Sequence, residues 1–246
     1  MNRTVPLTML RGIRQVRSAT GNEGPIVVAG ARELVPLLVK ELRAGGDPAA
    51  VSEGSATSRA SALVWIGDPD DHALRAASQA GTPIVGLAES GSLPYVLDTN
   101  LVFIRPGQGL PVAEVAMALA GVLGRNAPGL AARLPVLRPA VVESLIRGTV
   151  RKNALIGAAV FVPGADLPTL TLNEAVLAIR IAIAAGREAD PKTLLPELAG
   201  VLGAALVCRR LTRELRSLPV ARPVLNGAIA LAGTWAVGEA LRRRLA

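Results

Sequence analysis

The sequence predicts an α/β domain, built on a small and mostly parallel sheet, followed by a domain of apolar helices. Over residues 25–126, short apolar runs alternate with segments of helical periodicity, a pattern typical of a parallel sheet covered on both faces. After residue 139 the strand patterns stop, and longer segments rich in Ala, Leu and Val follow. We expect a P-loop-like or Rossmann-like topology without a P-loop, preceded by an arm at residues 1–24.

The α/β region contains four clear strand patterns and one weaker pattern near Val51. Continuous apolar runs predict buried strands at residues 25–30, 62–67, 82–87 and 101–105. Helices are predicted between them at residues 31–43, 70–80 and 111–123. Pro36 is compatible with the first of these helices only near its first turns. Asp68 is placed to cap the second helix.

Three prolines within residues 127–139 predict a linker between the two domains. Beyond it, residues 140–246 form the predicted helical domain. Its helices are expected at residues 140–162, 170–186, 192–217 and 221–245. None combines about 20 mainly apolar residues without interruption, the length that a single bilayer-spanning helix needs. Two shorter segments could still form a re-entrant hairpin with residues 163–168 at its tip.

The charge of the chain is concentrated in its second half. The net charge is +8, and residues 131–246 contain 16 basic and 8 acidic residues, which accounts for the whole excess. A basic and apolar half favours anionic lipid or an acidic partner. Aromatic residues make up 2% of the chain, so stacking on bases is not supported and we expect no nucleic acid partner. A single cysteine, Cys208, excludes an internal disulfide.

No catalytic constellation stands out, and we expect neither an enzyme nor a cofactor. A P-loop places Gly-Lys-Ser/Thr at its end to bind phosphate and magnesium. Counted from Gly30, those positions hold Val35, Pro36 and Leu37, so the lysine and the hydroxyl are missing. The acidic run at residues 68–71 is interpreted as helix-capping residues rather than as a metal site.

Residues 25–124 resemble the second half of a GTPase domain in the order of their segments. Residues 62–90 look like the strand, helix and strand that lead to the guanine-recognition motif Asn-Lys-x-Asp, and residues 105–124 look like the closing loop and helix. At the recognition motif this chain has Ala-Glu-Ser-Gly at residues 88–91. The resemblance implies a GTPase-like fold without its nucleotide-binding residues. The alternative is an α/β domain unrelated to GTPases.

Residues 140–245 resemble a YcjF-like domain of unknown function, which is found fused to bacterial GTPases or encoded beside them. The matching features are Asn153-Ala154, the Pro-Gly-Ala-Asp-x-Pro break at residues 163–168, Asn173 at the start of an apolar helix, and the Gly-Thr-aromatic-x-x-Gly ending at residues 233–238. The resemblance implies a membrane setting and a GTPase partner. Independently, Ala230, Thr234 and Gly238 form a small-residue stripe, which suits close helix packing in lipid or in an ordinary bundle.

The candidate binding residues flank the apolar segments. They are expected to bind a membrane or a protein partner; the alternative is a solvated basic surface. Asp166 is interpreted either as a turn residue or as a buried partner for Arg180. The complete set is Arg151, Lys152, Pro163, Gly164, Asp166, Pro168, Asn173, Arg180, Arg209, Arg210, Arg213 and Arg216.

These patterns together predict a non-enzymatic, membrane-associated accessory or scaffold protein of a bacterial GTPase system. It would dock a protein partner through the α/β domain and lie on the cytoplasmic side of the inner membrane, peripheral or re-entrant. No signal peptide is apparent at residues 1–16. One alternative is a soluble, cytoplasmic homo-oligomer with buried apolar helices. Another is an unusual nucleotide-binding enzyme.

Overall fold

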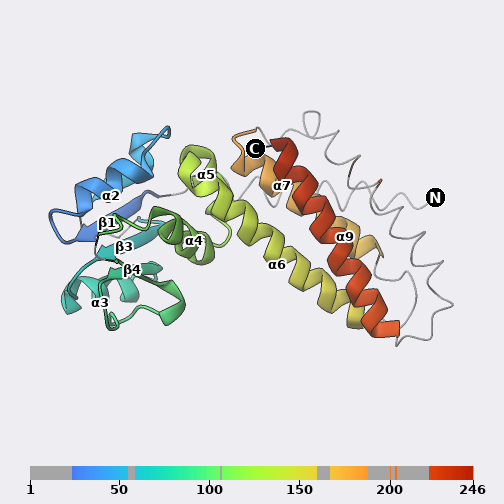
Figure 1. Cartoon of the computed structure of the whole chain (residues 1–246), viewed down its shortest axis with the longest axis horizontal. Coiled ribbons are helices and arrows are strands. Elements are labelled where there is room, and N and C mark those ends of the chain that lie inside the picture. Colours follow the sequence, from blue (N-terminus) through green and yellow to red (C-terminus); the bar gives the residue numbers. More distant parts are fainter. Residues whose placement is uncertain are drawn as a thin grey trace. The chain divides into compact units, whose positions relative to one another are not determined.

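The computed structural model describes residues 24–54, 59–105, 107–159, 167–187, 200, 203 and 222–245 (Figure 1). It confirms the predicted fold class, because a parallel α/β sheet is followed by a helical region. The chain divides into two compact units, and the boundary falls between Val141 and Val142, inside one helix. We describe each unit by itself.

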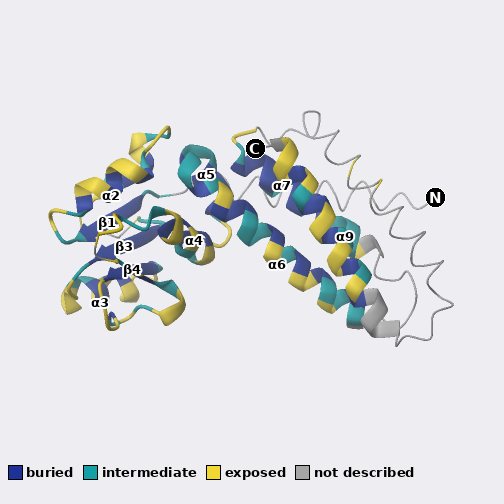
Figure 2. Cartoon of the chain, in the orientation of Figure 1, coloured by how far each residue is buried: buried dark blue, intermediate teal, exposed yellow. Residues whose placement is uncertain are grey.

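The α/β unit is built on a five-stranded sheet in which every pairing is parallel. The strand order is β2-β1-β3-β4-β5, a doubly wound order whose direction reverses between β1 and β3. The three inner strands are almost wholly buried, as their continuous apolar runs predict (Figure 2). The strands are β1 Ile26–Gly30, β2 Val51–Glu53, β3 Ala62–Ile66, β4 Ile84–Ala88 and β5 Leu101–Phe103.

Helices α2 (Val35–Leu42), α3 (Asp71–Gln79) and α4 (Val112–Val122) accompany the sheet, with short 3-10 turns η1 (Pro48–Ala50) and η2 (Asp98–Asn100). The predicted cap of α3 is wrong by two residues. Asp70, not Asp68, caps α3, because its side chain accepts hydrogen bonds from the amides of residues 72 and 73 at 3.0 and 3.1 Å. A cap directly precedes the first helical residue, and α3 begins at Asp71.

The segment predicted as a linker, residues 127–139, is instead helical and mostly buried. It forms α5 (Ala127–Arg133) and η3 (Pro135–Leu137), and α6 begins at Arg138. Leu130, Leu134 and Leu137 are fully buried. Arg133 forms an ion pair of 2.9 Å with Asp47, which ties the segment to the loop before η1. The α/β unit therefore includes this segment in its core.

The helical unit contains the described helices α6 (Arg138–Ala159), α7 (Leu167–Ala184) and α9 (Arg222–Leu245), which overlap three of the predicted helices. α7 is apolar around most of its circumference and is buried over most of its length, as such a helix must be. A Cβ added to Gly238 of α9 would lie 2.8 Å from a side-chain atom of Ile146 in α6, so the small residue permits close approach. The helix predicted at 192–217 lies largely outside the described residues.

Within the described part of the chain, no helix is both long and apolar enough to cross a membrane.

Candidate functional site

A chain of hydrogen-bonded polar side chains runs through the apolar helical unit and joins its three described helices. Lys152 and Asn153 belong to α6, Asn173 and Glu174 to α7, and Thr234 to α9. Lys152 Nζ donates to Asn173 Oδ1 at 3.0 Å, and Asn173 Nδ2 donates to Asn153 Oδ1 at 2.7 Å. Asn153 Nδ2 then donates to Thr234 Oγ1 at 2.9 Å, and Thr234 Oγ1 donates to Glu174 Oε1 at 3.1 Å. We call these five residues the polar relay.

The polar relay has a direction, because every member donates to the next. It begins at an exposed ammonium group and ends at the buried carboxyl group of Glu174. Asn153 and Thr234 are fully buried, so each hydrogen bond there replaces one that water would otherwise supply. A fully connected network in an apolar core penalises alternative helix registers, since a slip would leave its buried groups without partners.

Burial raises the pKa of Glu174 above its ordinary value of 4.5, and the hydrogen bond from Thr234 partly offsets that rise. Burial has this effect because it disfavours the charged form of a carboxyl group. The relay thus ends on a group whose neutral form the fold favours.

The pH dependence of Glu174 can be tested with Glu174→Gln, which keeps an oxygen acceptor for Thr234 but cannot ionise. A raised pKa contributes stability that is fully present below the unfolded value of 4.5 and is lost as the pH rises through the folded value. We therefore expect the free energy of unfolding of Glu174→Gln to rise relative to that of the wild type as the pH increases across that window. Above the window, the difference between the two proteins should stay constant. Denaturant unfolding of both proteins over this pH range measures the difference. A difference independent of pH would contradict the expectation.

Two of the predicted binding residues, Lys152 and Asn173, belong to the polar relay. Arg151 is exposed on α6, Arg180 is partly exposed on α7, and Pro168 falls in the first turn of α7. The remaining predicted residues lie outside the described residues: Pro163, Gly164, Asp166, Arg209, Arg210, Arg213 and Arg216. The proposed pairing of Asp166 with Arg180 is therefore not visible here.

Glu174 is the relay member that sequence reasoning missed. Its signal is an acidic residue inside a helix that is otherwise apolar from Ala175 to Ala184, apart from Arg180. The sequence places Thr234 in a small-residue stripe and in the Gly-Thr-aromatic-x-x-Gly ending, and the stripe is buried in the structure. A hydroxyl group in such a stripe also indicates a hydrogen-bond partner on a neighbouring helix.

A second feature is the outward side of α9. Every residue exposed there between residues 227 and 240 is apolar, and Leu231 and Trp235 are each 45% exposed. Thr234 is held inward by the polar relay, and consecutive helical residues are rotated by about 100°, so Trp235 is directed outward. We call this surface the α9 face; it comprises Ala228, Leu231, Ala232, Trp235, Ala236 and Ala240.

Exposed basic side chains lie on two of the described helices of the helical unit. Arg242, Arg243 and Arg244 follow the α9 face along the same helix, and all three are exposed. Glu239 lies 2.8 Å from Arg242 and 2.9 Å from Arg243, and these arginines lower the pKa of Glu239. On α6, Arg147, Arg151 and Lys152 share one exposed side. The helical unit thus presents an apolar surface with cations beside it.

No family model and no curated protein matches this chain. The resemblances to a YcjF-like domain and to GTPases therefore stay predictions. Three of the positions named in the first resemblance, Asn153, Asn173 and Thr234, are consecutive members of the polar relay.

The α/β unit has a cavity of about 380 Å³ at the carboxyl edge of its sheet, where doubly wound sheets bind ligands. Among the described residues its polar lining comes from Asp68, Glu89, Ser90 and Ser92, with no basic side chain. The amide of Ala31 is engaged with the carbonyl of Ile66 at 2.8 Å. Two carboxylates and no cation make this lining unfavourable for phosphate groups. No three His, Cys, Asp or Glu side chains gather as metal ligands among the residues described.

Proposed function

We propose that this chain is a non-enzymatic accessory protein of a bacterial GTPase system, and that its helical unit attaches it to an anionic membrane surface. The observation that supports the proposal is the α9 face, an exposed apolar helix surface that contains a tryptophan and leads into three arginines. Helices of this kind lie in the interfacial plane of a bilayer, with apolar side chains among the upper acyl chains and cations near the headgroups.

The charges next to the α9 face favour anionic lipid. Glu143 and Glu239 form ion pairs with Arg147, Arg242 and Arg243. Together with Arg244, these four arginines and two glutamates have a formal net charge of +2. Arg151 and Lys152, exposed on α6, add further positive charge to the same unit. A basic residue near an anionic bilayer contributes about 1 kcal/mol of attraction, so this electrostatic part of the binding should weaken as salt is added.

The connection to a GTPase partner rests on the two sequence resemblances. The α/β unit would supply the protein-binding part, and its ligand cavity would not need to bind nucleotide. The alternative is a soluble homo-oligomer in which the α9 face is covered by protein. An unusual nucleotide-binding enzyme requires phosphate recognition that neither the loop after β1 nor the acidic cavity favours.

Flotation with lipid vesicles tests the membrane part. The full chain is expected to float with vesicles that contain phosphatidylglycerol and to stay with the soluble fraction when only phosphatidylcholine is present. Leu231→Ser combined with Trp235→Ser should lower the bound fraction at least about tenfold, because two exposed apolar anchors are lost. The matched control is Leu37→Ser on α2, a leucine that is 53% exposed in the other unit.

Two results would overturn membrane docking. One is a wild-type protein that does not float with either type of vesicle. The other is an α9 double variant that floats as well as the control variant, because the attachment would then depend on another surface.

A further inference from the structure

The α/β unit has a groove of about 470 Å³ between strand β5 and helix α4. Phe103 of β5 and Met117 of α4 line it, and they are 47% and 43% exposed. Both are large apolar side chains, and they belong to the same opening as Leu101 and Ala118. Clustered exposure of this kind marks interaction surfaces more often than scattered single residues do.

β5 is also an outer strand of the sheet, and among the described residues no strand pairs with its far side. The amide of Ile104 donates to the carbonyl of Ala88 in β4 at 2.9 Å. Since backbone groups alternate in direction along a strand, those of Phe103 are directed to the open edge. A free edge of this kind is a template for pairing with another strand.

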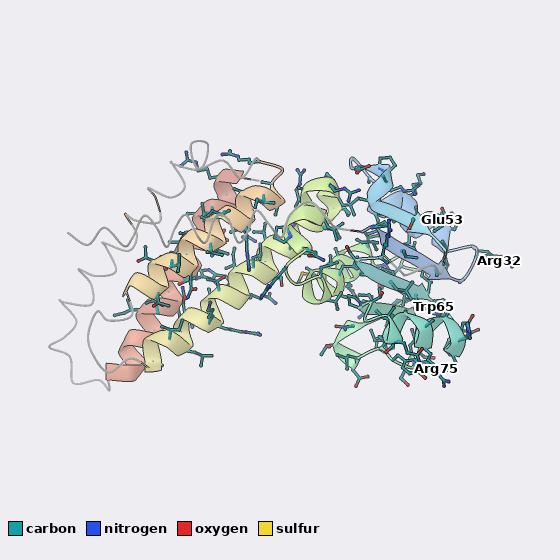
Figure 3. All side chains as sticks on the ribbon, turned by 180° about the vertical axis from the view of Figure 1, so that it is seen from behind. Arg32, Glu53, Trp65 and Arg75 are labelled. Atoms are coloured by element: carbon teal, nitrogen blue, oxygen red, sulfur yellow. The ribbon has the colours of Figure 1, made fainter. Side chains whose placement is uncertain are left out.

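The opposite outer strand, β2, is protected. The guanidinium group of Arg43 donates to the carbonyl of Val51 at 2.6 Å, which occupies a backbone acceptor of β2. The strand then ends in Ser52 and the exposed Glu53 (Figure 3), and charged residues prevent pairing at a sheet edge. One edge of this sheet is therefore capped and polar, while the other is apolar and lies beside a groove.

We propose that the β5–α4 groove is a self-association surface whose occupant is a second copy of this chain. A two-fold axis at the edge would set two β5 strands antiparallel to one another, and each Phe103 and Met117 would become covered. The groove lining supports a copy as the occupant because its described residues include one cation, Arg105, and one anion, Glu114. A two-fold interface must be complementary to itself, and a surface with one charge of each sign meets that condition.

The proposal goes beyond membrane docking and does not rest on it, since the residues of the groove belong to the α/β unit. The strand is short, so main-chain pairing alone would be weak. Apolar side chains in the groove would therefore supply most of the association, and exposed aromatic and methionine residues are enriched at such interfaces.

Sedimentation velocity of the full chain in lipid-free buffer tests this inference. The wild type is expected to show a concentration-dependent equilibrium between monomer and dimer. Phe103→Glu places two like charges at the two-fold interface and should weaken the dimer more than about 100-fold. Met117→Glu, on an exposed position of a helix, should act in the same direction without altering the strand.

Leu37→Glu is the control, because it adds the same charge to an exposed leucine of the same unit, and it should leave the dimer unchanged. Circular dichroism of each variant verifies that it is folded. A wild type that stays monomeric over the whole concentration range would overturn the inference. So would a dimer that survives both groove substitutions. Neither outcome affects the interpretation of vesicle flotation, because flotation tests the α9 face in the helical unit.

Discussion

Replacing Gly30 by alanine is expected to destabilise the α/β unit by about 4 kcal/mol or more. Gly30 ends β1 with φ = +112°, a backbone conformation that L-residues rarely adopt. A Cβ at this position would fall on the carbonyl oxygen of Ile66 in β3. That oxygen also accepts the hydrogen bond from Ala31, so it cannot move aside without breaking the turn after β1.

Gly54→Ala separates the two causes of this destabilisation, which are the strained backbone conformation and the clash of the Cβ with the Ile66 carbonyl. Gly54 has φ = +123°, and no atom of the described residues lies within 4 Å of its added Cβ. Gly54→Ala should therefore lower the free energy of unfolding only through backbone strain, by about 1–2 kcal/mol. The measurement is denaturant unfolding in a Trp235→Phe background, where Trp65 of β3 is the one remaining tryptophan. Equal losses in the two alanine variants would show that the Ile66 carbonyl imposes no constraint.

Replacing Thr234 by valine is expected to destabilise the helical unit by about 2–4 kcal/mol. Valine has nearly the same shape, so the packing of α9 is preserved. The variant loses both hydrogen bonds of the Thr234 hydroxyl group, the one accepted from Asn153 and the one donated to Glu174. Both partners would stay buried without this bond, which costs more than the bond itself contributes.

Thr234→Ser is the matched control, because it keeps the hydroxyl group and loses one methyl group. Its cost should be about 1 kcal/mol. Hydrogen exchange of α6, α7 and α9, measured by mass spectrometry on the full chain, reports the helical unit separately from the sheet. The valine variant should lose protection in all three helices. A loss confined to α9, or an equal loss in the serine variant, would mean that the polar relay does not couple the helices.

The sheet was predictable because its strands are short, continuous apolar runs. Val27, Val64 and Val85 lie in such runs, and each is buried in a parallel strand. Only the inner strands of a parallel sheet need apolar residues on both faces. The weaker pattern near Val51 corresponds to β2, which is an outer strand and turns polar after its first residue.

The linker prediction failed because prolines both end and begin helices. Pro128 lies in the first turn of α5, Pro135 in that of η3, and Pro139 in that of α6. The first turn tolerates proline because its amides have no partner within the helix. The missing signal is the apolar content of this stretch. Leu130, Leu134 and Leu137 are all buried, although they do not share one helix, because Leu134 is extended between α5 and η3.

The polar relay could be predicted only in part. Asn153, Asn173 and Thr234 attracted attention through a resemblance that says nothing about their contacts. Their meeting depends on the relative register of three helices, and apolar packing alone constrains that register weakly. Glu174 was missed because a single acidic residue is ordinarily expected to face water.

The buried segment from Ala127 to Leu137 has a consequence for how the protein is made. Its three leucines complete the core of the α/β unit, yet they are the last part of that unit to be synthesised. Ribosomes add about 5–20 residues per second, so this segment follows α4 over roughly a second. During that interval the nascent sheet is present without its closing leucines. We therefore expect slower translation just after α4 to lower the yield of folded protein, a property that no single contact in the finished fold reveals.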